Sequence, residues 1–84
     1  MIMFYDNLPT IDLHGYDREY AKLAMKEFIE DQHKMKNENV VIIHGNGSGI
    51  LKRVTQEFLK NNKLVQDYKI HNFNAGMTIV TLKK

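Results

Sequence analysis

The chain has 84 residues and a formal net charge of +2, which suits one domain with a small core. It has no cysteine, which excludes disulfides, thiolate metal sites and cysteine nucleophiles. No apolar run approaches the roughly 18 residues that cross a membrane, and the first residues lack the basic start of a signal peptide. We therefore expect a cytoplasmic protein with no membrane partner. Its weak basic excess permits an anionic ligand without requiring one.

A strand followed by a long helix is predicted near the N-terminus. Residues 10–14 alternate apolar and polar side chains, so Asp12 and His14 should share one face of a strand. Asp17 is a suitable helix N-cap, and residues 18–36 then repeat apolar side chains at helical spacing. We expect this stripe to be core: Ala21, Ala24, Met25, Phe28, Ile29 and Met35.

Two segments are distinguished along the chain. Residues 9–84 read as a single domain, entered at the only proline, Pro9. Residues 1–8 form an N-terminal extension rich in apolar side chains. We expect this extension to dock on the domain or on a second copy of it.

The middle of the chain predicts a second strand and a second helix. Residues 40–43 are an unbroken β-branched run, which is typical of a strand buried on both faces. A glycine-rich stretch over residues 44–49 leads into a helix over residues 49–61. That helix should bury Ile50 or Leu51, together with Val54 and Phe58.

Two further strands, over residues 65–73 and 77–83, are joined by a turn at residues 74–76. Because the turn is short, these strands should pair antiparallel. The complete order is β-α-β-α-β-β, in which strands linked through a helix run parallel. We predict an α/β fold in the form of an α+β two-layer sandwich, with a four-stranded mixed sheet and both helices on one face.

The two His-Gly pairs are the leading site candidates. His14-Gly15 and His44-Gly45 each end a predicted strand, and the carboxyl ends of parallel strands are where such sheets bind ligands. Neighbouring strands lie about 4.8 Å apart, so both imidazoles can face one pocket. Asp12 points the same way as His14. The spacing therefore predicts a site containing Asp12, His14 and His44.

An anion-binding loop is predicted beside this site. Glycine-rich turns that open a helix bring backbone amides close to an anion at the positive end of the helix dipole. The loop is neither a P-loop nor a dinucleotide-binding fingerprint, because its spacing fits neither. The candidate phosphate-binding residues are Gly15, Gly45, Asn46, Gly47, Ser48, Gly49, Lys52 and Arg53, with Asn74 and Gly76 of the last turn at the same edge.

The motifs resemble those of the Smr (small MutS-related) domain family. Residues 11–15, Ile-Asp-Leu-His-Gly, match its first motif, which is usually Leu-Asp-Leu-His-Gly. Residues 44–49, His-Gly-Asn-Gly-Ser-Gly, resemble the second, typified by His-Gly-Lys-Gly-Thr-Gly. Residues 76–82 resemble the closing strand, which usually follows a Gly-Gly-x-Gly loop. The resemblance covers nearly the whole chain from residue 9.

The resemblance implies a fold similar to the C-terminal domain of translation initiation factor three, and a module that nicks DNA or cleaves RNA. The chain departs from the pattern at four positions. Asn46 replaces the usual basic residue, and Lys52 replaces an Arg. Phe73 and Asn74 stand where two glycines usually open the last loop, so Phe73 either packs or offers a surface on which a base stacks.

The leading hypothesis is an endonuclease that cleaves phosphodiester bonds, with RNA favoured over DNA. One imidazole takes a proton from the attacking hydroxyl and the other protonates the leaving oxygen. Asp12 orients His14, while the loop amides and Lys52 or Arg53 bind the phosphate.

Two alternatives come from other classes of function. The same pocket fits a non-catalytic module that binds nucleic acid or the ribosome. Asp12, His14 and His44 also have the ligand types of a divalent metal site.

Overall fold

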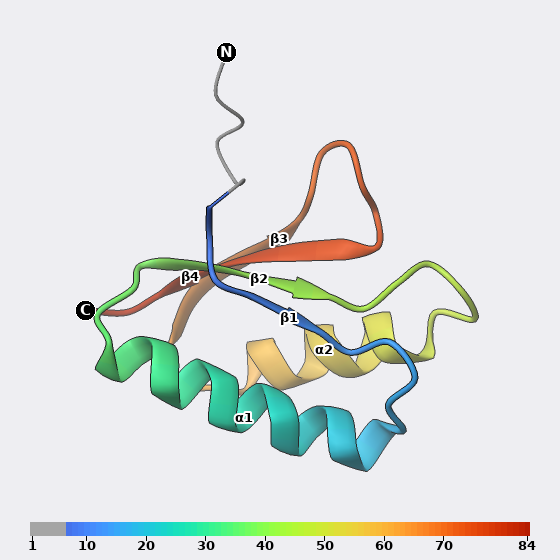
Figure 1. Ribbon diagram of the computed structural model, residues 1–84, viewed down its shortest axis with the longest axis horizontal. Helices are drawn as coiled ribbons and strands as arrows, with labels where there is room; N and C mark the ends of the chain where they lie inside the picture. The colour runs from blue at the N-terminus through green and yellow to red at the C-terminus, as the bar shows by residue number, and fades with distance from the viewer. Residues whose placement is uncertain (1–6) are drawn as a thin grey trace.

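The computed structural model describes residues 7–84 and contains four strands and two helices (Figure 1). In chain order these are β1 (Thr10–Asp12), α1 (Arg18–Lys34), β2 (Asn39–Ile43), α2 (Ile50–Lys60), β3 (Val65–Ile70) and β4 (Met77–Leu82). The predicted order is confirmed. The predicted docking of residues 1–8 falls largely on residues 1–6, which lie outside the described part of the chain.

The sheet order is β1-β2-β4-β3. β1 pairs parallel with β2, with Asp12 opposite Ile43. β4 lies between β2 and β3 and pairs antiparallel with both. β3 therefore runs in the direction of β1 and β2, and all three end at the same edge of the sheet. Both helices lie on one face, which confirms the two-layer architecture (Figure 1).

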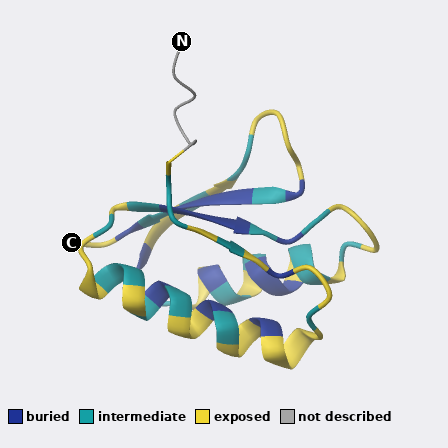
Figure 2. Ribbon diagram, viewed as in Figure 1, coloured by how far each residue is buried: buried dark blue, intermediate teal, exposed yellow. Residues whose placement is uncertain are grey.

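The core lies between the helices and the sheet (Figure 2). Alternate residues of β2 and β4 face the helices, such as Ile42 and Val80, which are fully buried. They meet buried side chains of both helices: Ala21, Met25, Ile29, Val54 and Leu59. The period of two in the strands and the period of 3.6 in the helices thus converge on one apolar layer.

The structure corrects one predicted core side chain, Met35, and decides between the two alternatives at the start of α2. Met35 is 66% exposed because α1 ends at Lys34 and Met35 is its C-cap. At the start of α2, the helical phase directs Leu51 toward the core and leaves Ile50 exposed. The predicted N-cap, Asp17, is confirmed, since its carboxylate accepts the Tyr20 amide at 2.8 Å.

The site-bearing strands end earlier than predicted. β1 stops at Asp12 instead of His14, although the Leu13 amide still donates to the Ile43 carbonyl at 2.8 Å. β3 stops at Ile70 instead of residue 73 because the His71 ring draws the next residues into a turn. Neither helix in residues 7–84 is long and apolar enough to cross a membrane.

Candidate functional site

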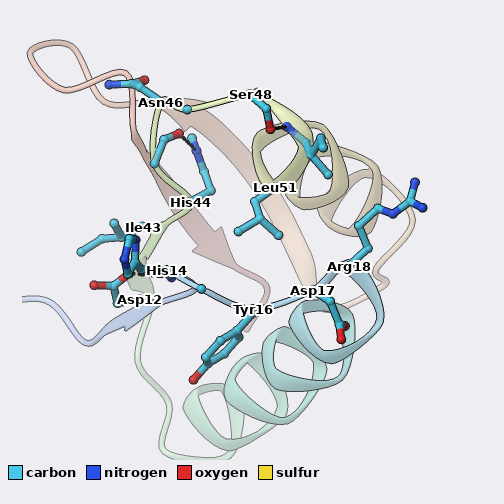
Figure 3. Close-up of a pocket in the computed structure, with 15 residues that line it drawn as sticks. Asp12, His14, Tyr16, Asp17, Arg18, Ile43, His44, Asn46, Ser48 and Leu51 are labelled. Atoms are coloured by element: carbon cyan, nitrogen blue, oxygen red, sulfur yellow. Dashed lines mark hydrogen bonds between the residues drawn. The ribbon is translucent and has the colours of Figure 1, made fainter.

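An open cleft of about 680 Å³ lies at the edge where β1 and β2 end (Figure 3). The turn after β1 forms one wall and the loop between β2 and α2 forms the other. All four residues of the two His-Gly pairs line it, as the spacing predicted. Its lining includes Asp12, His14, Gly15, His44, Gly45, Asn46, Gly47, Ser48 and Gly49.

His14 stands exposed on the turn that follows β1. Gly15 has φ +81°, a left-handed conformation that glycine adopts without strain, and the Tyr16 amide closes the turn on the Leu13 carbonyl at 3.0 Å. Within residues 7–84 the His14 imidazole has no hydrogen-bond partner. Its ring nitrogens, which lie beside Asp12 and Ile43 (Figure 3), are therefore available to a ligand at this edge of the sheet.

Asp12 fixes this turn through the backbone. Its Oδ1 accepts the His14 backbone amide at 2.9 Å, an Asx-type turn in which the side chain replaces a backbone acceptor. No hydrogen bond between the Asp12 carboxylate and the His14 ring occurs in the described residues. Asp12 thus positions His14 by shaping the turn that carries it, and the predicted contact to the imidazole is replaced by one to the amide.

His44 is in the opposite situation, since it is 5% exposed and both ring nitrogens have partners. Nδ1 lies 3.0 Å from the Gly45 carbonyl oxygen, which can only accept, so Nδ1 carries a hydrogen. Nε2 lies 2.8 Å from Thr78 Oγ1 and accepts from that hydroxyl when the ring is neutral. The His44 imidazole therefore ties the start of the glycine loop to β4.

Burial lowers the pKa of the His44 imidazole below its ordinary value of 6.5. The hydrogen bond to the Gly45 carbonyl opposes this shift, and the nearby positive charge of Lys52 adds to it. The net direction is downward, so His44 is neutral at physiological pH. The neutral ring matches the hydrogen-bond pattern described above.

The loop from Gly45 to Gly49 presents unpaired amides to the cleft. Gly45 and Gly49 have φ +79° and +84°, and a β-carbon added at either position would touch nothing within 4 Å. The Gly45 amide differs from the prediction, because it donates to the Gly76 carbonyl at 2.9 Å. Within residues 7–84 the amides of residues 46–49 have no hydrogen-bond partner, so these four are the ones free for an anion.

The remaining predicted residues lie around the cleft rather than in it. Gly76 is buried behind the loop, where its carbonyl accepts the His44 and Gly45 amides, both at 2.9 Å. Asn74 Oδ1 accepts the Gly76 amide at 2.9 Å and so supports the same contact. Lys52 lies near enough to His44 to disfavour its cation.

Arg53 lines a second groove, of about 470 Å³, together with Arg18 and Lys22. Arg18 also lines the main cleft, so its side chain lies between the two hollows at the start of α1. No motif or spacing in the sequence singles out Arg18. Thr78, the partner of His44, was also missed, because the pairing joins residues 34 positions apart.

Asp12, His14 and His44 do not form the metal ligand set that their types suggested. No group of three or more His, Asp or Glu side chains in residues 7–84 is arranged to hold a metal ion. The sheet register supplies the reason. Asp12 is opposite Ile43 and shares its face of the sheet, whereas His44 faces the helix side with Ile42 and Thr78.

Comparison with known proteins identifies the family. The Smr domain model matches residues 11–83, and so includes both His-Gly pairs and β4. The chain belongs to the Smr domain family. The Smr domain of Thermus thermophilus MutS2 has the same fold, with a TM-score of 0.89 at 24% identity over 92% of this chain and all of that one.

Other matching proteins are longer than this chain, which spans only part of each of them. YdaL, a stand-alone small MutS-related protein from Escherichia coli, superposes with a TM-score of 0.80 at 25% identity, covering 89% of this chain and 64% of YdaL. Endonuclease MutS2 of Clostridium acetobutylicum is 34% identical over 73 residues, and that of Caldanaerobacter subterraneus is 31% identical over 74. These matches cover 87% and 88% of this chain but 9% of each MutS2 protein.

Proposed function

We propose that this Smr domain is an endonuclease that cleaves phosphodiester bonds in nucleic acid, with RNA favoured over DNA. The observation that carries the proposal is the meeting, in one cleft, of an unpartnered imidazole on His14 and four unpaired amides at residues 46–49. The curated relatives named Endonuclease MutS2 support the same reaction class.

The glycine loop binds the scissile phosphate in this proposal. Free amides at the start of α2 donate to phosphate oxygens, and the helix dipole adds partial positive charge. No acidic residue lies in the first turn of α2 to oppose the anion. Lys52, which lies close enough to His44 to act on it, and Arg18 of the opposite wall supply full charges that favour the phosphate and the charge that builds on it during attack. Arg53 adds a further positive charge from the second groove.

His14 is the residue that exchanges a proton with the substrate. For RNA, the ribose 2′-hydroxyl attacks phosphorus while the His14 imidazole accepts its proton, and the bond from phosphorus to the 5′-oxygen breaks. The leaving oxygen then takes a proton from water. The preference for RNA rests on this internal nucleophile, because DNA cleavage at the same site requires an activated water.

His44 is a positioning residue in this proposal rather than the second proton carrier. Both of its ring nitrogens are engaged within the chain, and burial favours its neutral form. Its hydrogen bonds to Gly45 and Thr78 hold the start of the glycine loop against β4. A change at His44 should therefore act on phosphate binding and stability together.

A cleavage assay tests the proposal. His14→Ala should reduce cleavage of a labelled single-stranded RNA by about 10²- to 10⁴-fold, the usual range for a general acid or base. His33→Ala is the matched control, since His33 lies in the last turn of α1, away from the cleft. Full activity of the His14→Ala variant would refute the assignment. Parallel reactions with Mg²⁺ or EDTA, on RNA and on single-stranded DNA, test the substrate preference and metal dependence.

A second candidate function is a nucleic-acid or ribosome-binding module that does not cleave. The observation in its favour is that His44 has no ring nitrogen free for catalysis and that Asn46 contributes no charge to the loop. Binding whose affinity falls steeply with salt, without cleavage under any divalent metal, would select this function over the enzyme.

A further inference from the structure

The loop between β3 and β4 carries one large apolar side chain, and Phe73 is 88% exposed there. Exposure alone indicates little, because single apolar residues are common on protein surfaces. Two further features of this loop are the hydrogen bonds that order its backbone and its contact with the wall of the cleft.

The backbone beneath Phe73 is held by side chains of the same loop. The His71 Nδ1 atom accepts two amides, those of Phe73 at 3.0 Å and Asn74 at 3.1 Å. On the other side of the tip, Asn74 Oδ1 accepts the Gly76 amide at 2.9 Å. The His71 and Phe73 rings meet edge to face, with centroids 6.1 Å apart. The phenyl ring is thus presented outward on an ordered turn, which lowers the entropy lost when a ligand binds it.

The base of this loop is joined directly to the wall of the cleft. The Gly76 carbonyl accepts the amides of His44 and Gly45, and a β-carbon on Gly76 would lie 3.2 Å from the Gly45 Cα. Both loops lie at the same end of the sheet (Figure 1), and the tip is exposed (Figure 2). Phe73 and Gly76 are three residues apart, and three extended residues span at most about 11 Å. Nucleotides along one strand are spaced about 3.4 Å apart, so this distance corresponds to about three nucleotides.

We infer that Phe73 is a stacking platform for an unpaired base of single-stranded nucleic acid whose phosphate occupies the neighbouring cleft. This inference rests on the proposed function and specifies its substrate as single-stranded near the site. A base inside a duplex offers no free face, whereas an unpaired base stacks on an exposed aromatic ring. Stacking of this kind tolerates any base, so it gives preference for strandedness rather than for sequence.

The surroundings of Phe73 favour a base over a protein partner. Its chain neighbours Asn72, Asn74 and Ala75 are exposed and small or polar, so Phe73 is the one large apolar side chain within residues 72–75. A stable protein interface buries about 1,200–2,000 Å² around an apolar centre, which one ring among amides does not supply. One aromatic face beside an anion-binding loop matches the size of a single nucleotide.

Tryptophan fluorescence tests the inference directly, because the chain contains no tryptophan. Phe73→Trp places an aromatic reporter at the proposed contact, and Met35→Trp places a matched reporter at an exposed position at the far end of α1. Addition of a single-stranded RNA 12-mer should quench the emission of the Phe73→Trp chain and leave that of Met35→Trp unchanged. A duplex of the same sequence should quench neither.

An affinity measurement with labelled oligonucleotides supplies the second readout. Phe73→Leu, which keeps an apolar group but removes the aromatic face, should weaken binding of the single strand about tenfold and change duplex binding little. Phe73→Tyr should bind as the wild type does. Equal affinity of the Phe73→Leu and wild-type chains, or binding to Phe73→Trp without quenching, would overturn the inference and leave the proposed function standing.

Two further outcomes distinguish failure of the proposed function from failure of the inference alone. Absence of any nucleic-acid binding by the wild-type chain would refute the proposed function, and the inference with it. Loss of self-association in the Phe73→Leu variant on a sizing column, with single-strand affinity unchanged, would assign the ring to a contact between copies of the chain and overturn the inference.

Discussion

The two His-Gly pairs have the same sequence and opposite environments. His14 lies in the turn after β1, a three-residue edge strand, and its ring is exposed and without a hydrogen-bond partner in the described chain. His44 directly follows β2, a central strand, and its ring is buried between the Gly45 carbonyl and the Thr78 hydroxyl. The difference follows from position in the sheet, because only the central strand has β4 beside it to provide a partner and to exclude water.

The comparison separates two tasks that one dipeptide can perform. At His14 the imidazole is left to the ligand, and Asp12 shapes only the backbone under it. At His44 the imidazole serves the fold, and the loop after it supplies the free amides. Chemistry and architecture are thus divided between the walls of one cleft, and three substitution experiments test that division.

The largest expected effect is on stability at His44. His44→Ala removes two hydrogen bonds and leaves the buried Thr78 hydroxyl without a partner, which should lower the free energy of unfolding by about 2 kcal/mol or more. His14→Ala should change it by less than about 0.5 kcal/mol, as at most exposed positions. Urea unfolding of both variants measures the contrast. Equal losses would show that the two environments do not differ as described.

A smaller effect is expected from the glycines of the loop. Gly45→Ala places a side chain at φ +79°, where the left-handed conformation costs about 1–2 kcal/mol. Gly47→Ala is the matched control, because Gly47 has no positive φ and open space at its β-carbon position. Thermal unfolding should show a lower Tm for Gly45→Ala and little change for Gly47→Ala. A lower Tm for both would indicate that space in the loop, rather than backbone conformation, is limiting.

The smallest effect is a pH dependence that His44 introduces. Because the pKa of its imidazole is lowered in the folded chain, the unfolded chain binds the proton first as pH falls. The wild type should therefore lose stability as pH drops below about 6.5 and keep losing it until the folded pKa is reached. His44→Gln removes this component, so the difference in unfolding free energy between the two chains should narrow toward pH 5. A difference in unfolding free energy that stays constant with pH would contradict the lowered pKa of His44.

Much of the fold follows from local patterns. The β-branched run at residues 40–43, the N-cap at Asp17 and the short turn before β4 each predicted a structure that formed. Met35 was misassigned because helical spacing continues past the point where the helix ends. Successive helical residues point in directions about 100° apart, so only one of Ile50 and Leu51 can face the core. Which of them does so depends on where α2 begins.

The site was less predictable because its decisive contacts are long-range. The sequence placed both histidines at one sheet edge, but the burial of His44 depends on Thr78, which belongs to β4. The Gly45 amide is taken by Gly76, another contact across the sheet. Asp12 could face the ring or the amide of His14 from the spacing alone, and the tight turn at Gly15 favours the amide.

The β3–β4 loop has an anchored base and an exposed tip. The base is anchored at Gly76, whose carbonyl accepts hydrogen bonds from the His44 and Gly45 amides. Residues 72, 73 and 75 are exposed and can vary in side chain without disturbing that anchor. Asn74 supports the anchor through the Gly76 amide, and a change at Gly76 reaches the Gly45 backbone. The β3–β4 loop is therefore a grafting point. Exchanging its tip would retune which ligands the domain accepts while the histidines, the glycine loop and the sheet stay as they are.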